Sequence, residues 1–260
     1  MHAQKVLDQP VASNACARNS GFHFDQRVSV LTALTRILWM LGLPDQALAH
    51  AQQAMDRALD INHSISLCYA LSLACTPVAI WTGDWERAAR LTHLLQERAK
   101  EFSLEYRQAY VEGFELLFRR RQGSTEGLET LTNPATGVIL KDLLCTCDAG
   151  LADEAALARG ESEAGGWCAP ELLRLRGERA RGAGDPQAAS RWFRRGIELA
   201  RRQQALSWEL RCATSLADLL QASGSTAEAH ACLLSVVQGF TEGFDTADLH
   251  RASALLEQLS

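Results

Sequence analysis

Amphipathic helical patterns fill most of the chain. Apolar residues recur three or four positions apart, which places them on one face of a helix. This spacing predicts helices at residues 25–41, 45–61, 64–81, 85–102, 105–122, 138–149, 170–183, 188–203, 207–222, 226–240 and 246–259. No stretch alternates apolar and polar residues for long, and β-branched residues are sparse. Strong helix formers dominate instead, so an all-α fold is predicted.

A glycine followed five positions later by a small or apolar residue recurs along the chain. The six pairs are Gly42/Ala47, Gly83/Ala88, Gly123/Leu128, Gly150/Ala155, Gly184/Ala189 and Gly224/Ala229. Successive glycines are 41, 40, 27, 34 and 40 residues apart. Periods of roughly 20–50 residues with helical content are typical of solenoids. We therefore predict an α-solenoid of stacked antiparallel helix hairpins, closed by a capping helix at residues 246–259.

Each of these glycines is predicted to form the turn of a hairpin. Glycine adopts a positive φ at the end of a helix without steric cost, because it has no Cβ. Pro44 and Pro186 suit the first turn of a helix, where a missing N–H is harmless. Four residues that directly follow a glycine can cap the next helix: Asp84, Ser124, Asp185 and Ser225. The small residue five positions after the glycine lets the two helices approach closely.

One copy of the repeat is better preserved than the others. Gly177, Ala189, Phe193 and Gly196 match the small, small, aromatic and small positions of the tetratricopeptide repeat. The interval between Gly123 and Gly150 is too short for a full hairpin. We therefore expect the array to be shortened around residues 130–166, with a loop at residues 130–137.

Five stretches together resemble the C-terminal tetratricopeptide-like region of large bacterial signalling ATPases. They are HFDQRVSVLTALTRILWMLGLPDQAL (23–48), NHSISLCYAL (62–71), APELLRLRGE (169–178), ALSWELRCATSLADL (205–219) and TEGFDTADLHRASALLEQL (241–259). Proteins of that family carry a winged-helix DNA-binding domain or a class III adenylate cyclase domain, then an NTPase domain, then the helical array. The resemblance implies one helical-repeat domain at residues 23–260, preceded by a remnant of another repeat helix at residues 1–22.

The catalytic parts of that family have no counterpart here. The chain contains no G-x-x-x-x-G-K-[ST] phosphate loop, no G-x-S-x-G and no H-E-x-x-H. Its seven histidines do not show metal-ligand spacing, and Cys145 and Cys147 would point in nearly opposite directions on a helix. We therefore expect a non-enzymatic protein without a metal or cofactor.

Net charge and cysteine content bear on nucleic-acid binding and on the cellular location. The formal net charge is −5, so no global positive field attracts nucleic acid. The eight cysteines include no CxxC pair and most lie in apolar helical stretches, which indicates buried thiols in a reducing cytosol. The N-terminus lacks the apolar core of a signal peptide. Residues 65–81, the most apolar run, are predicted to be too short and too polar to span a membrane. A cytoplasmic location is expected.

The first helices of the hairpins line the concave face of such arrays. Aromatic and Arg side chains are enriched at binding hot spots, and the tryptophans on these helices are assigned to the core. The candidate binding residues, expected to be exposed in the groove, are Arg36, Tyr69, Arg107, Tyr110 and Arg211. The leading hypothesis is a protein-binding or sensor module of a transcription regulator. The alternatives are an array that binds a small effector, and a truncated remnant of a larger regulator.

Overall fold

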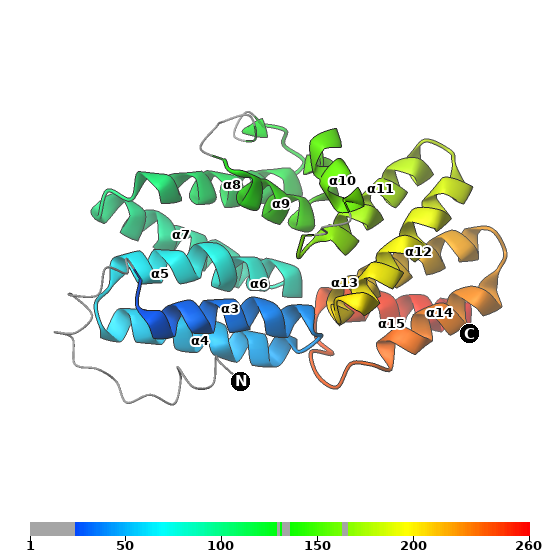
Figure 1. Cartoon of the computed structure of the whole chain (residues 1–260), viewed down its shortest axis with the longest axis horizontal. Helices are drawn as coiled ribbons and strands as arrows, with labels where there is room; N and C mark the ends of the chain where they lie inside the picture. The colour runs from blue at the N-terminus through cyan, green and yellow to red at the C-terminus, as the bar shows by residue number, and fades with distance from the viewer. Residues whose placement is uncertain (1–23, 129–130, 132–135, 163–165) are drawn as a thin grey trace. The chain divides into compact units, whose positions relative to one another are not determined.

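The computed structural model describes residues 24–128, 131, 136–162 and 166–260. Over these residues the chain is all-α and has no strand. It has twelve helices when α5 and α6, which are continuous, are counted as one, and helices that follow one another in sequence pack antiparallel (Figure 1). The all-α prediction is confirmed. The predicted helix remnant at residues 1–22 lies outside the described residues. The chain divides into two compact units, Met1–Trp39 with Asp45–Gly137, and Met40–Pro44 with Val138–Ser260.

The first unit is built from the helices of the N-terminal half. They are α3 (Gln26–Met40), α4 (Pro44–Asp60), α5 (Ser64–Ala70), α6 (Thr76–Thr82), α7 (Trp85–Glu101) and α8 (Glu105–Arg121). A wide π-helical turn, Leu71–Cys75, joins α5 to α6, so Ser64–Thr82 is one continuous helix. These bounds differ from the predicted ones by at most a residue or so at each end.

Two contacts fix how α3 lies on the helix that contains α5 and α6. The backbone N–H of Asp25 donates to Oγ of Ser66 at 2.8 Å, and the rings of Trp39 and Trp81 lie 4.4 Å apart. The starts and the ends of the two helices therefore meet, so they run parallel. Helix α7 packs against α6 and against α8. Trp39 and Trp81 are each 2% exposed, which confirms their assignment to the core.

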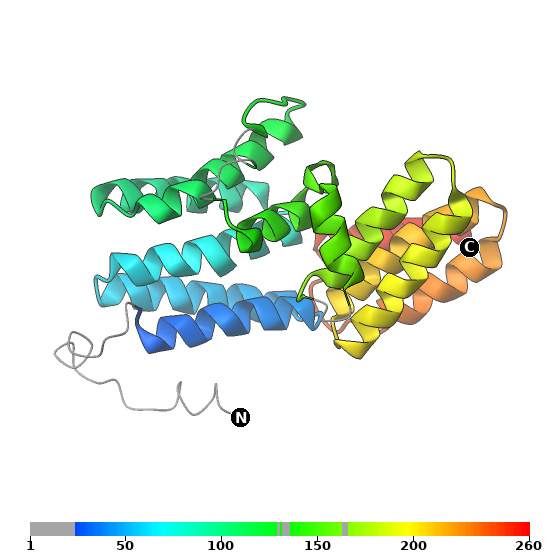
Figure 2. The same cartoon turned by 45° about the horizontal axis from the view of Figure 1, so that its top comes forward.

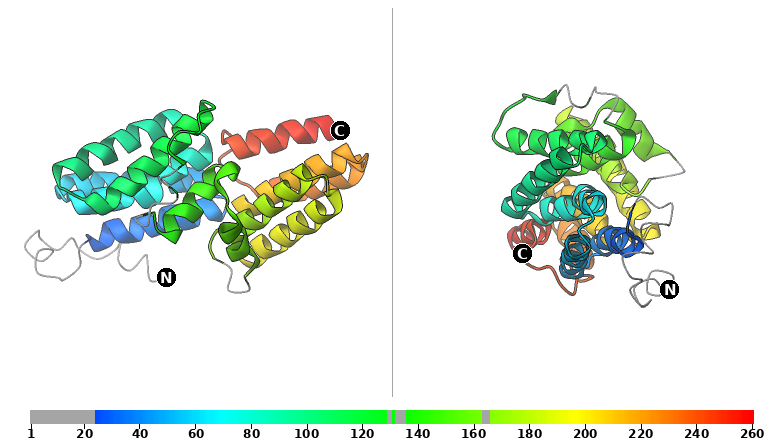
Figure 3. Two further views of the ribbon diagram at one scale, coloured as in Figure 1. Left: turned by 90° about the horizontal axis from the view of Figure 1, so that it is seen from above. Right: turned by 90° about the vertical axis from the view of Figure 1, so that its left-hand side faces the viewer.

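The second unit contains the remaining helices (Figure 2). They are α9 (Val138–Cys147), α10 (Glu154–Glu161), α11 (Ala169–Gly182), α12 (Pro186–Arg202), α13 (Leu206–Ala222), α14 (Thr226–Val237) and α15 (Ala247–Leu259). Each of α11 to α14 packs on the next helix, and α15 closes the unit against α13 and α14 (Figure 3). The apolar residues of α15 that were noted at helical spacing join this core, including Leu249, Ala252 and Leu255.

Five of the six glycines have the predicted positive φ, and four of these, all but Gly123, join two helices of a hairpin. Gly42, Gly83, Gly123, Gly184 and Gly224 have φ between 80° and 90°. Gly150 does not adopt a positive φ, because it lies within a short 3-10 turn, Ala149–Leu151, and its N–H donates to the carboxylate of Asp148. The prediction of a hairpin turn at Gly150 is therefore wrong.

Helix starts follow the predicted chemistry only in part. The carboxylates of Asp84 and Asp185 accept hydrogen bonds from the third residue beyond them, as N-caps do, and α4 and α12 begin at Pro44 and Pro186. Ser225 occupies the N-cap position of α14, but its hydroxyl makes no capping hydrogen bond. The hydroxyl of Ser124 accepts from Glu126 N–H and starts no α-helix.

Small residues at Gly177 and Gly196 lie in close contacts between helices. Gly177 of α11 lies so close to the ring of Phe193 of α12 that a Cβ there would be 2.4 Å from the ring. A Cβ on Gly196 would be 2.8 Å from Sγ of Cys212 on α13. Ala189 and Phe193 are fully buried. Close approach of α11, α12 and α13 therefore depends on these small residues.

The region of the shortened repeat departs from the prediction. Over the described residues that follow α8, no α-helix forms before α9, so the expected short partner helix of α8 is absent from them. Leu128 is 37% exposed and Ala155 is also exposed, so neither serves as the buried contact residue. Ala156 is buried instead, in α10, a helix that the Gly150/Ala155 pair indicated without bounds. Most of the predicted loop at residues 130–137 lies outside the described residues.

The continuous helix Ser64–Thr82 corrects one sequence argument. It has 19 residues and a mean hydropathy of 1.6, so by length and composition it could cross a membrane. The prediction that it is too short and too polar is wrong. However, 83% of its most apolar 18 residues are buried inside the protein, which is the environment of a core helix.

Candidate functional site

Four of the five predicted binding residues belong to one cluster in the first unit. We call Phe24, Arg36, Tyr69, Arg107 and Tyr110 the aromatic–arginine cluster. The guanidinium carbon of Arg107 lies 5.6 Å from the ring centre of Tyr69 and 5.5 Å from that of Tyr110. The rings of Phe24 and Tyr69 are 4.5 Å apart. Three helices that each begin a predicted hairpin, α3, α5 and α8, supply its arginines and tyrosines.

Burial and positive charge both act on the phenol of Tyr110. Burial raises the pKa of Tyr110 above its usual value, while the charges of Arg107 and Arg36 act in the opposite direction. The nearby thiol of Cys68 shows the same pattern, since burial raises its pKa to about 11 against the charges of Arg107 and Arg98. Arg36 is thus close enough to Tyr110 to belong to the same electrostatic environment.

The expectation that all candidates are exposed is wrong. Arg107 is only 5% exposed, and Arg36, Tyr69 and Tyr110 are half-buried. A guanidinium sandwiched between two tyrosine rings is covered by them, because cation–π contacts bring the ring faces over the charge. Arg107 therefore holds the rings in place, while Arg36 and the two tyrosines keep part of their surface accessible.

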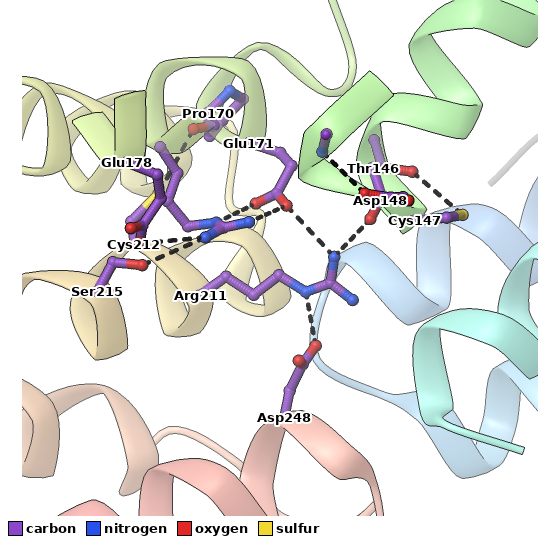
Figure 4. A network of polar contacts seen from close by, with 12 residues as sticks. Thr146, Cys147, Asp148, Pro170, Glu171, Glu178, Arg211, Cys212, Ser215 and Asp248 are labelled. Carbon is purple, nitrogen blue, oxygen red and sulfur yellow. Dashed lines mark hydrogen bonds and ion pairs between the residues drawn. The ribbon is translucent and has the colours of Figure 1, made fainter. Parts of the chain in front are cut away.

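Arg211, the fifth candidate, lies in the second unit and belongs to a different arrangement (Figure 4). Its guanidinium donates to Oδ2 of Asp248 at 2.7 Å and to the backbone carbonyl of Thr146 at 2.8 Å. It also lies 3.5 Å from Oε1 of Glu171 and 5.1 Å from the ring centre of Trp208. Its side chain is 15% exposed. It connects α9, α11 and α15 rather than facing an open groove.

Glu171 is the centre of this ionic network. Its carboxylate is 1% exposed and accepts two hydrogen bonds of 2.8 Å from Arg174, one at each oxygen. Arg174 also reaches Oγ of Ser215 at 3.3 Å and Oε1 of Glu178 at 3.5 Å. Burial by itself would raise the pKa of Glu171, but the charges and hydrogen bonds of Arg174 and Arg211 outweigh burial and hold that pKa below its usual value. The ionised form is therefore the stable one.

Glu171, Arg174 and Asp248 were not among the binding residues predicted from the sequence. A signal was present for the first two, because a Glu and an Arg three positions apart on an otherwise apolar helix face can pair. Asp248 gave no comparable signal, since its partner lies 37 residues away in sequence.

The cysteines are poor candidates for nucleophiles. Cys68, Cys75, Cys145, Cys168 and Cys212 are buried, and burial raises the pKa of each of these thiols, to about 12 for Cys75 and Cys145. A raised pKa keeps the thiol protonated and unreactive. Cys145 is buried and Cys147 half-buried, although they are only two residues apart on α9. Among the described residues, no three His, Cys, Asp or Glu side chains form a group that could hold a metal ion. Cys16 lies outside them.

Comparison with known proteins adds no identification. No protein-family model and no curated protein matches the chain.

Proposed function

We propose that the chain is a tetratricopeptide-like α-solenoid and a non-enzymatic interaction module of a bacterial regulatory system. The preserved spacing and tight packing of Gly177, Ala189, Phe193 and Gly196 support the repeat type, since these are its small and aromatic positions. In such arrays the first helices of successive hairpins line an extended binding surface.

One observation carries the functional part of the proposal. Tyr69 and Tyr110 come from α5 and α8 and lie against Arg107 with part of their surface accessible. Arg36 of α3 acts through its charge on Tyr110 and is also partly accessible. Arg and Tyr anchors dominate the affinity of many protein interfaces. We propose that a partner protein binds the first unit at this cluster.

A pull-down from bacterial lysate tests this proposal. The bait is the full chain, either wild-type or carrying Tyr69→Ala and Tyr110→Ala. The control is Phe244→Ala, which removes an exposed aromatic side chain from the second unit. We expect the double variant to lose a captured protein that wild-type and control retain, while thermal melting shows that all three are folded.

Other outcomes would contradict the proposal. If the folded double variant captures the same proteins as wild-type, the cluster is not the binding surface. If no protein is captured but a small molecule raises the melting temperature, the array is an effector-binding module instead.

A further inference from the structure

The start of α3, the end of α4 and the start of α5 meet at one end of the first unit (Figure 1). The backbone N–H of Asp25 donates to Oγ of Ser66 at 2.8 Å, and the carboxylate of Asp25 pairs with the guanidinium of Arg57 at 3.4 Å. Ser66 is fully buried, and its Oγ also lies 2.8 Å from Nδ1 of His63. His63 is the N-cap of α5 and is half-buried, so part of its surface is accessible to solvent. A histidine therefore completes the contact that joins these three helices.

The hydrogen bonds determine the protonation state of the His63 ring. Its Nδ1 accepts from the backbone N–H of Ser66 at 3.2 Å, and a backbone N–H can only donate. Nδ1 therefore carries no proton, so the ring is neutral and its single proton is on Nε2. The hydroxyl of Ser66 must then donate to Nδ1 while it accepts from Asp25 N–H. The hydrogen bonds thus run in one direction, from Asp25 through Ser66 to His63.

A second proton on this ring would oppose the contact in two ways. A proton on Nδ1 would face the N–H of Ser66, which would lose the acceptor that caps the helix. The positive ring would also lie at the N-terminus of the continuous helix Ser64–Thr82, where the helix dipole favours negative charge. Histidine is the side chain whose ordinary charge change falls between about pH 5 and pH 8. Weak acid therefore acts against this arrangement.

The neighbouring charges do not offset that cost. The helices packed around the start of α5 and the turn before it contribute these charged groups: Asp25 of α3, Arg57 and Asp60 of α4, Arg98 and Glu101 of α7, and Arg107 of α8. Arg98 pairs with Glu101 at 2.8 Å, as Asp25 does with Arg57, and Asp60 is exposed. Among the described residues, the histidines that pair with a carboxylate are His93 and His250, not His63.

We propose that His63 is a pH-sensitive cap that holds the start of α3 on α5 near neutral pH and loosens this contact in weak acid. The contribution to stability is complete while the ring is neutral and is lost as pH falls and the ring takes up a proton. The segment that is loosened includes Phe24, whose ring lies 4.5 Å from that of Tyr69 in the aromatic–arginine cluster. The inference concerns the conformation of the first unit and does not depend on a partner binding there.

Nitrogen NMR of the histidine rings in the full chain tests the protonation state. The variant His63→Asn identifies the His63 signals by their loss. At about pH 8 we expect the ring proton on Nε2 and none on Nδ1. During titration to about pH 5, the backbone amide signals of Ser66 and Asp25 should shift together with the ring. In Ser66→Ala, the shift of the Asp25 amide should be lost, because the hydroxyl that connects it to the ring is absent.

Urea unfolding measures the effect on stability. His63→Asn keeps a good N-cap side chain that does not titrate. Between about pH 8 and pH 5, the folding equilibrium constant of the wild-type protein should fall about fivefold more than that of His63→Asn, which is the typical contribution of one N-cap. The matched control is His93→Asn on α7, where the histidine side chain is 68% exposed. This control should keep the wild-type dependence on pH.

Three results would overturn the inference. The first is a ring of His63 that carries its proton on Nδ1 at about pH 8. The second is a folding equilibrium constant that depends on pH equally in wild-type and His63→Asn. The third is an Asp25 amide that still titrates with the ring in Ser66→Ala, because the contact would then not pass through Ser66.

Discussion

At the scale of single residues, close helix contacts in the second unit depend on glycines, which have no side chain to keep the helices apart. Gly177 faces the ring of Phe193, and Gly196 faces both Sγ of Cys212 and the backbone carbonyl of Pro170, 3.2 Å from where a Cβ would lie. Backbone atoms and aromatic rings can move little to make room for an added Cβ, since protein interiors are close-packed. These two glycines therefore set the distance between α12 and its neighbours.

Replacing Gly177 with Ala should lower the free energy of unfolding by about 1–3 kcal/mol, the usual cost of overpacking a core. The matched control is Gly182→Ala in the same helix, where no atom lies within 4 Å of the added methyl group. Because Ala restricts the unfolded chain, the control should be neutral or stabilising by about 0.5–1 kcal/mol. Urea unfolding followed by circular dichroism measures both. Equal stability of the two variants would show that the contact with Phe193 is not tight.

A second residue-scale prediction concerns helix capping. The carboxylate of Asp185 accepts a hydrogen bond of 2.8 Å from Ala188 N–H at the start of α12. We expect Asp185→Ala to destabilise the protein by about 0.5–2 kcal/mol. Ser225→Ala should cost less, because Ser225 makes no capping hydrogen bond in the structure. Melting temperatures of the two variants provide the comparison, and a larger loss for Ser225→Ala would contradict the assignment of the caps.

At the scale of secondary-structure elements, the ionic network ties α11 to α13 and α15 and should make stability depend on pH. The pKa of Glu171 is lower in the folded protein than its usual value of about 4.3. The unfolded chain therefore binds this proton more readily, so the stabilisation is complete above about pH 4.3 and is lost as pH falls through the lower folded pKa.

We expect Glu171→Gln to reduce stability at neutral pH and to flatten its decline between about pH 4.3 and lower pH. Removing one member of a buried ion pair costs about 3–5 kcal/mol, because the partner charges stay buried. The control is Glu198→Gln, whose side chain is 71% exposed and pairs with Arg202 on the surface. Chemical denaturation at several pH values in this range measures the free energy of unfolding of both variants and the wild-type protein. A pH dependence unchanged by Glu171→Gln would assign the acid sensitivity to other carboxylates.

Element bounds were predictable where the signals were local. Apolar spacing, glycine at the turn and proline or aspartate at the next helix start all act within a few residues, and they located most helices closely. Prediction failed near Gly150, because a glycine can also enter a 3-10 turn, and Asp148 stabilises that turn here. The bounds of the short helix α10 were not predicted, because only three of its eight residues are buried and the apolar pattern is short.

The candidate site was predictable only as a set of residue types. Placing Arg36, Tyr69, Arg107 and Tyr110 on first helices followed from the repeat. The structure brings Tyr69, Arg107 and Tyr110 into contact, and the charge of Arg36 acts on Tyr110. Their burial depends on the stacking of Arg107 between two rings from different helices. The partners of Arg211 depend on contacts across 37, 40 and 65 residues of sequence. Such long-range pairs leave no periodic signal in one sequence.

At the scale of the whole molecule, each helix packs mainly on its neighbours in sequence. A destabilising substitution should therefore increase local unfolding first in the adjacent helices. Ala189 is fully buried in the core shared by α12, α13 and α14. An Asp at this position would bury an unpaired charge. We expect Ala189→Asp to cost on the order of 4 kcal/mol and to raise hydrogen–deuterium exchange most strongly in α11 to α14.

The control for this prediction is Ala227→Asp. Ala227 is exposed in the first turn of α14, where a negative charge is favoured by the helix dipole. Its exchange pattern should match that of the wild-type protein. Exchange that rises evenly over every helix in the Ala189→Asp variant would instead indicate that the chain unfolds as one cooperative unit.

The wide turn at Leu71–Cys75 has a consequence for the evolutionary history of the chain. A turn closed by i to i+5 bonds holds about one residue more than an ordinary helical turn, so it absorbs an insertion without rotating the helix beyond it. Ser66 before the turn and Trp81 after it both meet α3 in register. Homologous chains should therefore vary in length by one residue here, and their Trp81 equivalents should keep the same orientation. An insertion in α7, which has no such turn, would rotate every later side chain by about 100°.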